Sequence, residues 1–377
     1  MHPSLTLSGY DLRNLSVAVL GGHSALDVAH GAKQNRFRTL AVTQEGRSAT
    51  YAKYFRTNGE RGCIDETFEL KSFQEVLEPE TQEWLRERNA IFVHNRYFWV
   101  YVDEFAKVER SFTVPIFGSR SLLKLEERDQ PYNQYHLLAD AGIRSPKIFK
   151  SAKDIDRPVL VKASEPARGY ERAFFFAPDA ASYERIGSDL EKEGKVGKDW
   201  RNATIEEFVV GAPVNFNFFY SPLTGELELL GTDTRRQTNL DGFLRLPSWQ
   251  QEDVRKAIPL KMIETGHIAV TVKESILEKA FDLGEKFVAA CKKLPREIDP
   301  DQKGIIGPFA LQGAVVAEDG REDIVIFDVS LRIPGSPGIA ATPYSSYLFG
   351  HTMTMGERVG MELRRAADTK SLDQILT

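Results

Sequence analysis

The chain has 377 residues, of which 42% are hydrophobic and 27% are charged, and its formal net charge at pH 7 is −5. At about 100–200 residues per domain this length predicts two or three domains, and the composition excludes a disordered chain. The slight acidic excess argues against a nucleic-acid partner. Cys63 and Cys291 are the only cysteines and belong to no C-x-x-C pattern, so we expect a reducing compartment and no structural zinc site.

The N-terminal residues 1–14 are mixed and polar, unlike the charged and then apolar build of a signal peptide. No apolar run in the sequence approaches the roughly 20 residues that span a bilayer. We therefore expect a cytoplasmic protein without a membrane partner.

Strand-like and helix-like segments alternate in the first third of the chain. This alternation predicts a parallel sheet that is covered by helices on both faces. Pro115 predicts that the last of these strands is short or lies at an edge. We expect strands at 16–20, 39–42, 90–93 and 114–117 and helices at 24–35 and 72–88.

The remaining two thirds combine further helices with strands that form hairpins. Gly142 and Pro146 end a helix at 133–141, and proline and glycine within 221–225 predict a hairpin turn. We expect other strands at 159–162, 204–210, 309–316 and 324–330, a turn at 318–321, and helices at 181–195, 273–293 and 355–367.

The turn Gly21-Gly22-His23-Ser24 stands between the first strand and the first helix. Glycines permit a tight turn, and a helix N-terminus offers free N–H groups to a phosphate. The dinucleotide fingerprint would need glycine at His23 and Leu26, so NAD binding has little support. His23 could contact a phosphate or carry a proton. The alternative is an exposed histidine in a tight turn.

Two neighbouring turns carry arginines. Arg96 follows the strand at 90–93, and Arg120 follows the strand at 114–117. Because the carboxyl ends of parallel strands lie on one edge of a sheet, we expect both arginines to face an anion near His23. Taken singly, each arginine would more often be a solvated surface residue.

A second candidate site begins at Lys162, which ends the strand at 159–162 and either caps the sheet edge or points into a cleft. The loop at 164–172 could fold over phosphates, although it contains a single glycine. Glu206 and Glu207 are adjacent in a strand, so their side chains point to opposite faces and only one can line a given cleft. The alternative is a solvated acidic pair.

The most informative pattern joins Gln312 to Asp328 and Arg332. By the period of two, Asp328, Ser330 and Arg332 share one face of a strand whose other face is apolar. The oxygens of Gln312 and Asp328 suit Mg²⁺ that bridges nucleotide phosphates, and Arg332 suits a phosphoryl or acyl-phosphate group. The alternative is a polar outer face with an Asp–Arg pair. The loop at 334–338 (PGSPG) could approach a ligand closely.

The order of these features resembles the ATP-grasp superfamily. In detail it resembles the archaeal formate-dependent ligases that formylate the purine intermediate AICAR (5-aminoimidazole-4-carboxamide ribonucleotide). The similar stretches cover nearly the whole chain and are 22–27, 31–33, 114–118, 208–211, 219–223, 228–231, 239–242, 306–309 and 343–345.

This resemblance implies an α/β fold in which an N-terminal, Rossmann-like pre-ATP-grasp domain (1–125) precedes a two-lobed ATP-grasp α+β domain. The small and large lobes would span 126–210 and 211–377. The implied activity is that of a ligase that uses ATP and Mg²⁺ (or Mn²⁺) to convert formate into formyl phosphate, which the 5-amino group of AICAR then attacks. The products would be formyl-AICAR, ADP and phosphate, and the enzyme would form a homo-oligomer.

The resemblance also implies a role for each candidate residue. These residues are His23 and Ser24 for AICAR, Lys162, Glu206 and Glu207 for ATP, Gln312 and Asp328 for the metal, and Arg332 with His23 for catalysis.

Four positions depart from the family pattern. Tyr97 stands where the family has a serine that contacts AICAR, and His267 stands where it has an asparagine contact. Gln237 replaces a glutamate near the nucleotide, and Asp328 replaces a metal-binding glutamate. These changes leave two alternatives, a paralogous ligase with another substrate and a non-catalytic nucleotide-binding relative.

Overall fold

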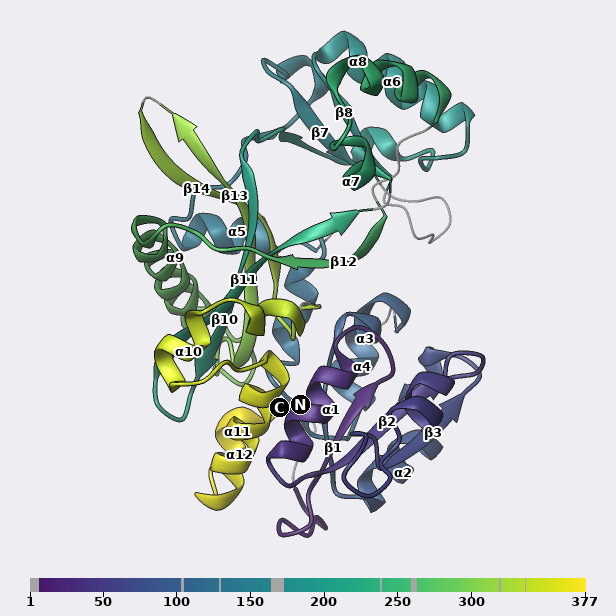
Figure 1. Cartoon of the computed structure of the whole chain (residues 1–377), viewed down its shortest axis with the longest axis vertical. Coiled ribbons are helices and arrows are strands. Elements are labelled where there is room, and N and C mark those ends of the chain that lie inside the picture. The colour runs from purple at the N-terminus through teal and green to yellow at the C-terminus, as the bar shows by residue number, and fades with distance from the viewer. Residues whose placement is uncertain are drawn as a thin grey trace.

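The computed structural model describes residues 7–102, 105–128, 130–163, 173–237, 239–258, 263–318, 320–335 and 337–377. Its described strands form one parallel and two antiparallel sheets. Figure 1 shows the parallel sheet at the bottom, a long antiparallel sheet through the middle and a small one at the top. The expected α/β class is confirmed, whereas the loop at 164–172 lies outside the described residues.

The parallel sheet is formed by the first five strands. They are β1 (Ser16–Leu20), β2 (Arg38–Gln44), β3 (Glu66–Leu70), β4 (Ala90–Val93) and β5 (Ile116–Phe117). Their order is β3-β2-β1-β4-β5, and the two-residue β5 lies at an edge, as Pro115 predicted. The sequence analysis missed β3, because its sequence ETFEL is half-buried and carries no clear apolar run.

Helices cover both faces of this sheet. They are α1 (Ala25–Gln34), α2 (Pro79–Glu87), α3 (Arg96–Tyr101) and α4 (Phe105–Ser111). Val17 and Val19 of β1 share a hydrophobic core with α1, whereas Ala18 and Leu20 share another core with α2. The single helix expected at 72–88 is wrong, because a 3₁₀ helix precedes α2. Pro79 starts α2, where its missing N–H is harmless, but it would break a continuous helix.

The small antiparallel sheet follows helix α5 (Gln134–Asp140). Its strands are β6 (Ile148–Phe149), β7 (Val159–Lys162), β8 (Phe174–Ala177) and β9 (Thr204–Glu207), in the order β6-β9-β7-β8. Helix α6 (Ala180–Lys192) covers one face through a core around the fully buried Trp200. The strand expected at 204–210 is β9, which ends at Glu207, three residues earlier than predicted.

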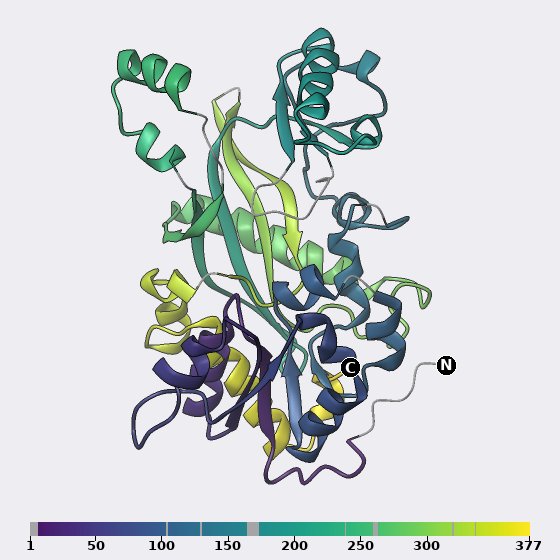
Figure 2. The same ribbon diagram turned by 90° about the vertical axis from the view of Figure 1, so that its right-hand side faces the viewer.

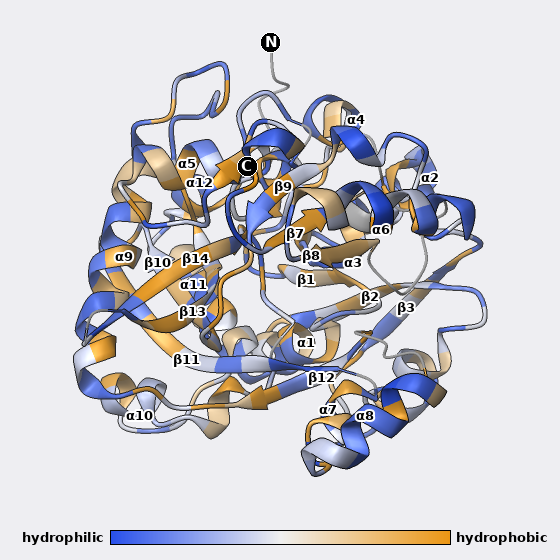
Figure 3. Cartoon of the chain, turned by 90° about the horizontal axis from the view of Figure 1, so that it is seen from above, coloured by the Kyte–Doolittle hydropathy of each residue, from blue (hydrophilic) through white to orange (hydrophobic). Residues whose placement is uncertain are grey.

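The long antiparallel sheet carries both of the expected hairpins. Its strands are β10 (Ala212–Ser221), β11 (Glu226–Gln237), β12 (Glu264–Ala269), β13 (Gly307–Glu318) and β14 (Arg321–Ser330), in the order β12-β11-β10-β13-β14. Helix α9 (Glu274–Lys292) packs on it through Phe287, which stacks on Phe309. Figure 3 shows that much of β13 and β14 beside α9 is hydrophobic.

Two short helices lie between β11 and β12 in the sequence. They are α7 (Leu240–Phe243) and α8 (Ser248–Ala257), and Figure 2 shows them projecting from the body of the molecule. None of the described helices combines the length and the apolar character that crossing a bilayer requires.

The C-terminal helices return to the parallel sheet. They are α10 (Tyr344–Phe349), α11 (Met355–Asp368) and α12 (Leu372–Ile375). Helix α11 lies beside α1 (Figure 1), and a methyl group on Gly31 would come within 2.1 Å of the Gly356 backbone. The Gly356 N–H also donates to Asp27 at 3.0 Å. This contact joins α1 to α11. The domain division at 125 and 210 stays a prediction.

Candidate active site

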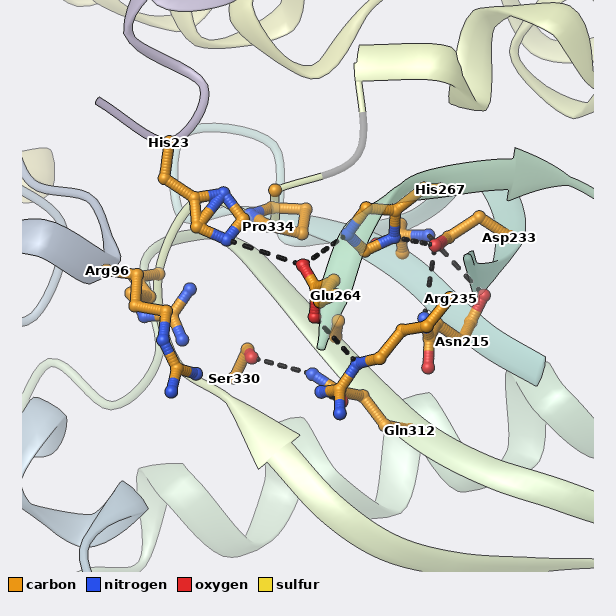
Figure 4. A pocket seen from close by; sticks show the side chains of 14 residues that line it. His23, Arg96, Asn215, Asp233, Arg235, Glu264, His267, Gln312, Ser330 and Pro334 are labelled. Carbon is orange, nitrogen blue, oxygen red and sulfur yellow. Dashed lines mark hydrogen bonds and ion pairs between the residues drawn. The ribbon is translucent and has the colours of Figure 1, made fainter. Parts of the chain in front are cut away.

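A polar pocket lies where the His23 turn meets the long antiparallel sheet (Figure 4). One side comes from the carboxyl edge of the parallel sheet, where ligands of α/β proteins bind. The other side comes from β10, β11, β12, β13 and the end of β14. The pocket is therefore formed jointly by the parallel sheet and the long antiparallel sheet.

His23 enters the pocket from the turn between β1 and α1. Its imidazole lies directly on Gly335, since a methyl group on Gly335 would lie 1.3 Å from Cε1 of the ring. Burial and, to a smaller extent, the Arg332 guanidinium lower the pKa of His23 to about 4. The ring is therefore neutral at pH 7. Pro334 and Gly335 of the loop at 334–338 line the pocket beside this histidine, and the close approach of this loop to a ligand stays a prediction.

Ser24 joins the same turn to that loop. Its hydroxyl donates to the Pro334 carbonyl at 2.6 Å, and it is not one of the residues that line the pocket. The Ser24 hydroxyl therefore ties the turn to Pro334, and its contact with the substrate stays a prediction.

The two arginines that we expected to converge on His23 lie in different places. Arg96 lines the pocket with His23. Arg120 is 3% exposed, and its guanidinium donates to the carbonyls of Val114 and Thr377, both at 2.9 Å. The expectation for Arg120 was wrong, because it stabilises buried backbone instead of facing an anion.

Tyr97 lies behind the His23 turn. Its ring meets the imidazole edge-on, with the ring centroids 6.4 Å apart, and a methyl group on Gly22 would come within 2.1 Å of it. Tyr97 does not line the pocket among the described residues. The ring supports the backbone of the turn, and the substrate contact expected of Tyr97 stays a prediction.

His267 lines the pocket between two acids. Its Nδ1 hydrogen-bonds to Asp233, and its Nε2 lies 3.0 Å from Glu264. An ionised carboxylate only accepts hydrogen bonds, so both ring nitrogens donate and the ring is an imidazolium. Burial alone would lower the pKa of His267, but the two carboxylates raise it to about 9.

Lys162 and Glu206 form a buried ion pair on the small sheet. The distance from Nζ to Oε1 is 2.7 Å, and the side chains are 4% and 3% exposed. Lys162 also donates to the Tyr135 hydroxyl at 3.3 Å and to the Phe327 carbonyl at 3.2 Å. The two candidate nucleotide contacts therefore lie together, against the end of β14.

Glu207 lies on the opposite face of β9. Its carboxylate pairs with Arg157 at 3.1 Å and accepts from the Lys147 N–H at 3.2 Å. Of the two adjacent acids, only Glu206 points inward, because successive strand residues face opposite sides. A contact of Glu207 with ATP stays a prediction.

Gln312 and Asp328 face each other across β13 and β14. Asp328 accepts from Arg128 at 3.0 Å, and the Arg235 guanidinium bonds Gln312 and lies 3.9 Å from Asp328. Within the described ranges no group of three or more His, Cys, Asp or Glu could hold a metal by itself. One carboxylate and one amide would nevertheless suit Mg²⁺ that binds together with nucleotide phosphates, because phosphate and water oxygens complete the coordination shell of the ion.

Arg332 and Ser330 line the pocket beyond that pair. The Arg332 guanidinium is buried and lies 3.2 Å from Glu126, while its Nε has no hydrogen-bond partner in the described part of the chain. Ser330 accepts from the Gln312 amide at 2.9 Å. The polar face predicted for β14 thus reaches the pocket through Ser330 and Arg332, whereas Asp328 lies nearer to Lys162.

Gln237 ends β11 outside the pocket. Its backbone N–H donates to the Asp241 carboxylate at 3.2 Å, and the neighbouring residue 238 is not described. A role of Gln237 near the nucleotide stays a prediction.

Several site residues escaped the sequence analysis. The polar period of two along β10 and β11 could have indicated three of them, which are Asn217, Asp233 and Arg235. No local pattern marks the other residues, which are Arg128, Tyr135 and Glu264.

Comparisons with known proteins cover nearly the whole chain. One family model, described as a domain of unknown function (DUF1297), matches residues 182–377, and another, described as a protein of unknown function (DUF1246), matches residues 17–149. Two similar proteins are named 5-formaminoimidazole-4-carboxamide-1-(beta)-D-ribofuranosyl 5'-monophosphate synthetase. That of Methanopyrus kandleri is 36% identical, covering 98% of this chain and 97% of its own. That of Methanosphaera stadtmanae is 35% identical, covering 98% and 96%.

Solved structures resemble the fold as well. An IMP biosynthesis protein PurP from Thermococcus kodakaraensis is 25% identical with a TM-score of 0.68, covering 96% of this chain and all of its own. The N5-carboxyaminoimidazole synthetase from Staphylococcus aureus complexed with ADP has a TM-score of 0.55 at 10% identity, covering 90% of this chain and 77% of its own. At that identity the likeness shows the fold alone, and it confirms the expected ATP-grasp architecture.

Proposed function

This chain belongs to the family of the 5-formaminoimidazole-4-carboxamide ribonucleotide synthetases, and we propose that it joins formate to the 5-amino group of AICAR with ATP as the phosphoryl donor. A formate oxygen attacks the γ-phosphorus and displaces ADP, which gives formyl phosphate. The amine nitrogen then attacks the formyl carbon, phosphate leaves and the amine loses a proton. The products are formyl-AICAR, ADP and phosphate.

The observation that carries this proposal is a continuous line of contacts between the Lys162 ion pair and the His23 pocket. Tyr135 bonds both Lys162 and Arg128, and Arg128 bonds Asp328. Asp328 faces Gln312, whose amide bonds Ser330 at the pocket wall. A reaction through an acyl phosphate needs its phosphoryl donor and its amine at adjoining sites, and β13 and β14 supply both.

The nucleotide side of this arrangement is assigned to Lys162, Glu206, Gln312 and Asp328. The Lys162 ammonium is a point charge suited to phosphate, and Glu206 holds it in position. Gln312 and Asp328 would hold Mg²⁺ together with the phosphates. When bound, the ion supplies positive charge that stabilises the transferring phosphoryl group.

The substrate side is assigned to His23, Arg332 and His267. The Arg332 guanidinium is oriented by Glu126, and its free Nε offers a donor to the acyl-phosphate oxygens. The neutral His23 ring accepts the proton that the amine loses. The His267 imidazolium adds a fixed positive charge to the same pocket.

Release of ADP from ATP tests the proposal. With Mg²⁺, formate and AICAR all present, ADP should accumulate together with formyl-AICAR, and omission of either formate or AICAR should stop steady turnover. Steady ADP release at a rate that does not depend on AICAR would exclude the proposed reaction.

A second candidate is ligation of a different amine, and the His267 imidazolium favours it. A cation at a position where the family pattern has a neutral asparagine alters what the pocket attracts. A panel of aminated ribonucleotides and carboxylates distinguishes the two reactions, since efficient turnover of AICAR and formate alone would exclude this alternative.

We also propose a homo-oligomer, because closed symmetric assemblies are the usual state of soluble oligomeric enzymes. Light scattering at several protein concentrations measures the mass in solution. A mass of one chain at every concentration would exclude the oligomer.

A further inference from the structure

Asn217 carries a buried hydrogen-bond acceptor without a partner. The residue lies on β10, lines the pocket and is 1% exposed. Its amide nitrogen donates to Asp233 at 2.6 Å and to the Gly231 carbonyl at 3.3 Å. Its side-chain oxygen finds no partner among the described residues. Buried polar atoms are nearly always paired, so this oxygen can accept a hydrogen bond from a molecule that enters the pocket.

The orientation of the Asn217 amide is determined by its neighbour. An ionised Asp233 only accepts hydrogen bonds, so the amide nitrogen and not the oxygen must face it. Asp233 also accepts from Asn215 at 3.1 Å and from His267, which occupies its oxygens with protein donors. The Asn217 oxygen is therefore an acceptor that this group of side chains leaves unused.

The neighbour of Asn217 on β13 has a small side chain. Asn217 is paired in register with Ala310, and Ala310 in turn with Ser330. Ala310 and Ser330 also line the pocket. A ligand that enters this pocket would therefore meet Ser330 and the Asn217 oxygen on the same wall.

Charged side chains of both signs surround this gap. Figure 4 shows Arg96 on one side and Asp233, Asn215 and Arg235 on the other. Arg332 also lines the pocket and carries a buried Nε–H without a partner among the described residues. A ligand in this pocket would therefore meet cationic donors at the arginines and an unused acceptor at the Asn217 oxygen.

We propose that Asn217 determines specificity by accepting an N–H from an uncharged amide next to the reacting amine. The inference rests on the proposed function, under which this amide is the 4-carboxamide of AICAR. A carboxylate in its place would present only acceptors to the Asn217 oxygen. The Asn217 oxygen therefore disfavours the carboxylate analogue of AICAR.

Equilibrium binding and kcat/KM test this inference with three ligands, which are AICAR, its 4-carboxylate analogue and its methyl ester. The ester is uncharged but has no N–H at this position. Wild-type protein should prefer AICAR over each analogue by about five- to a hundredfold, the range expected when a buried acceptor is left unpaired. Because this comparison changes only the ligand, it does not depend on the folding of a variant.

Asn217→Ala should lose affinity for AICAR, and its preference for AICAR over the ester should disappear. Asn215→Ala is the matched control, since it also removes one donor from Asp233 but keeps the Asn217 oxygen. It should keep the preference for AICAR even where overall affinity falls. Circular dichroism of both variants reports whether they fold.

The possible outcomes separate this inference from the proposed function. If wild-type protein forms formyl-AICAR but binds AICAR and the ester equally well, the proposed role of Asn217 is wrong, and the proposed ligase activity is still supported. An Asn217→Ala variant that folds and keeps its preference leads to the same conclusion. If wild-type protein does not bind AICAR at all, the proposed function and this inference both fall.

Discussion

The imidazole of His23 lies against the α-carbon of Gly335, with no room between them for a methyl group. His23 belongs to the first βα turn of the chain, and Gly335 belongs to the loop after β14. The Ser24 hydroxyl reinforces the contact by binding Pro334. The pocket therefore exists only when the parallel sheet and the long antiparallel sheet are joined at this point.

Gly335→Ala should displace the His23 ring and weaken the use of AICAR. A misplacement of about 1 Å can reduce a rate by about a hundredfold, and we expect a loss in kcat/KM for AICAR approaching that size with ATP affinity unchanged. Gly338→Ala in the same loop is the matched control, because a methyl group there meets nothing within 4 Å. Equal kinetics for the two variants would contradict the importance of the His23–Gly335 contact.

Glu206 and Glu207 provide a paired test of the nucleotide side. Glu206→Gln removes one member of a buried ion pair, which typically costs about 3–5 kcal/mol, and should weaken ATP binding because Lys162 loses its positioning partner. Glu207→Gln alters a partly exposed pair with Arg157 and should change stability by less than about 0.5 kcal/mol. Urea unfolding and ATP titration measure both effects. A stronger loss of ATP affinity from Glu207→Gln would reverse the assignment.

Asp328→Asn should abolish ligation while the protein remains folded. The amide keeps the shape of the side chain but removes the one negative charge that the proposed ion would contact on β14. ADP release is measured against Mg²⁺ concentration. We expect residual activity, if any, to need far more Mg²⁺ than wild type, and an unchanged Mg²⁺ dependence would show that Asp328 is not a ligand.

The stability of the protein should depend on the ionisation of His267. Its pKa is raised from 6.5 to about 9, so the native state binds this proton more tightly than the unfolded chain does. The stabilisation is therefore fully present below about pH 6.5 and is lost as the pH rises through about 9. Unfolding free energies across this range should fall for wild type and fall less for His267→Gln. Parallel pH profiles for the two proteins would argue against the imidazolium.

The sequence indicated those parts of the site that depend on local periodicity. The period of two along β14 placed Ser330 and Arg332 on one face, and the glycine turn placed His23 at the sheet edge. Periodicity does not predict the position of a side chain that is determined by contacts between residues far apart in the sequence. Nothing local distinguishes Arg96, which faces the pocket, from Arg120, which binds buried carbonyls. Glu264 was missed for the same reason, because its role depends on the approach of β12 to Arg235 and His23.

Turnover with formate labelled with a heavy oxygen isotope tests the central claim most directly. In the proposed reaction a formate oxygen becomes bonded to the γ-phosphorus, and that oxygen leaves with phosphate when the amine attacks. Mass spectrometry of the products should therefore find one labelled oxygen in the released phosphate and one in the formyl group of formyl-AICAR. Phosphate without label, released while ATP is consumed, would contradict an acyl-phosphate ligase.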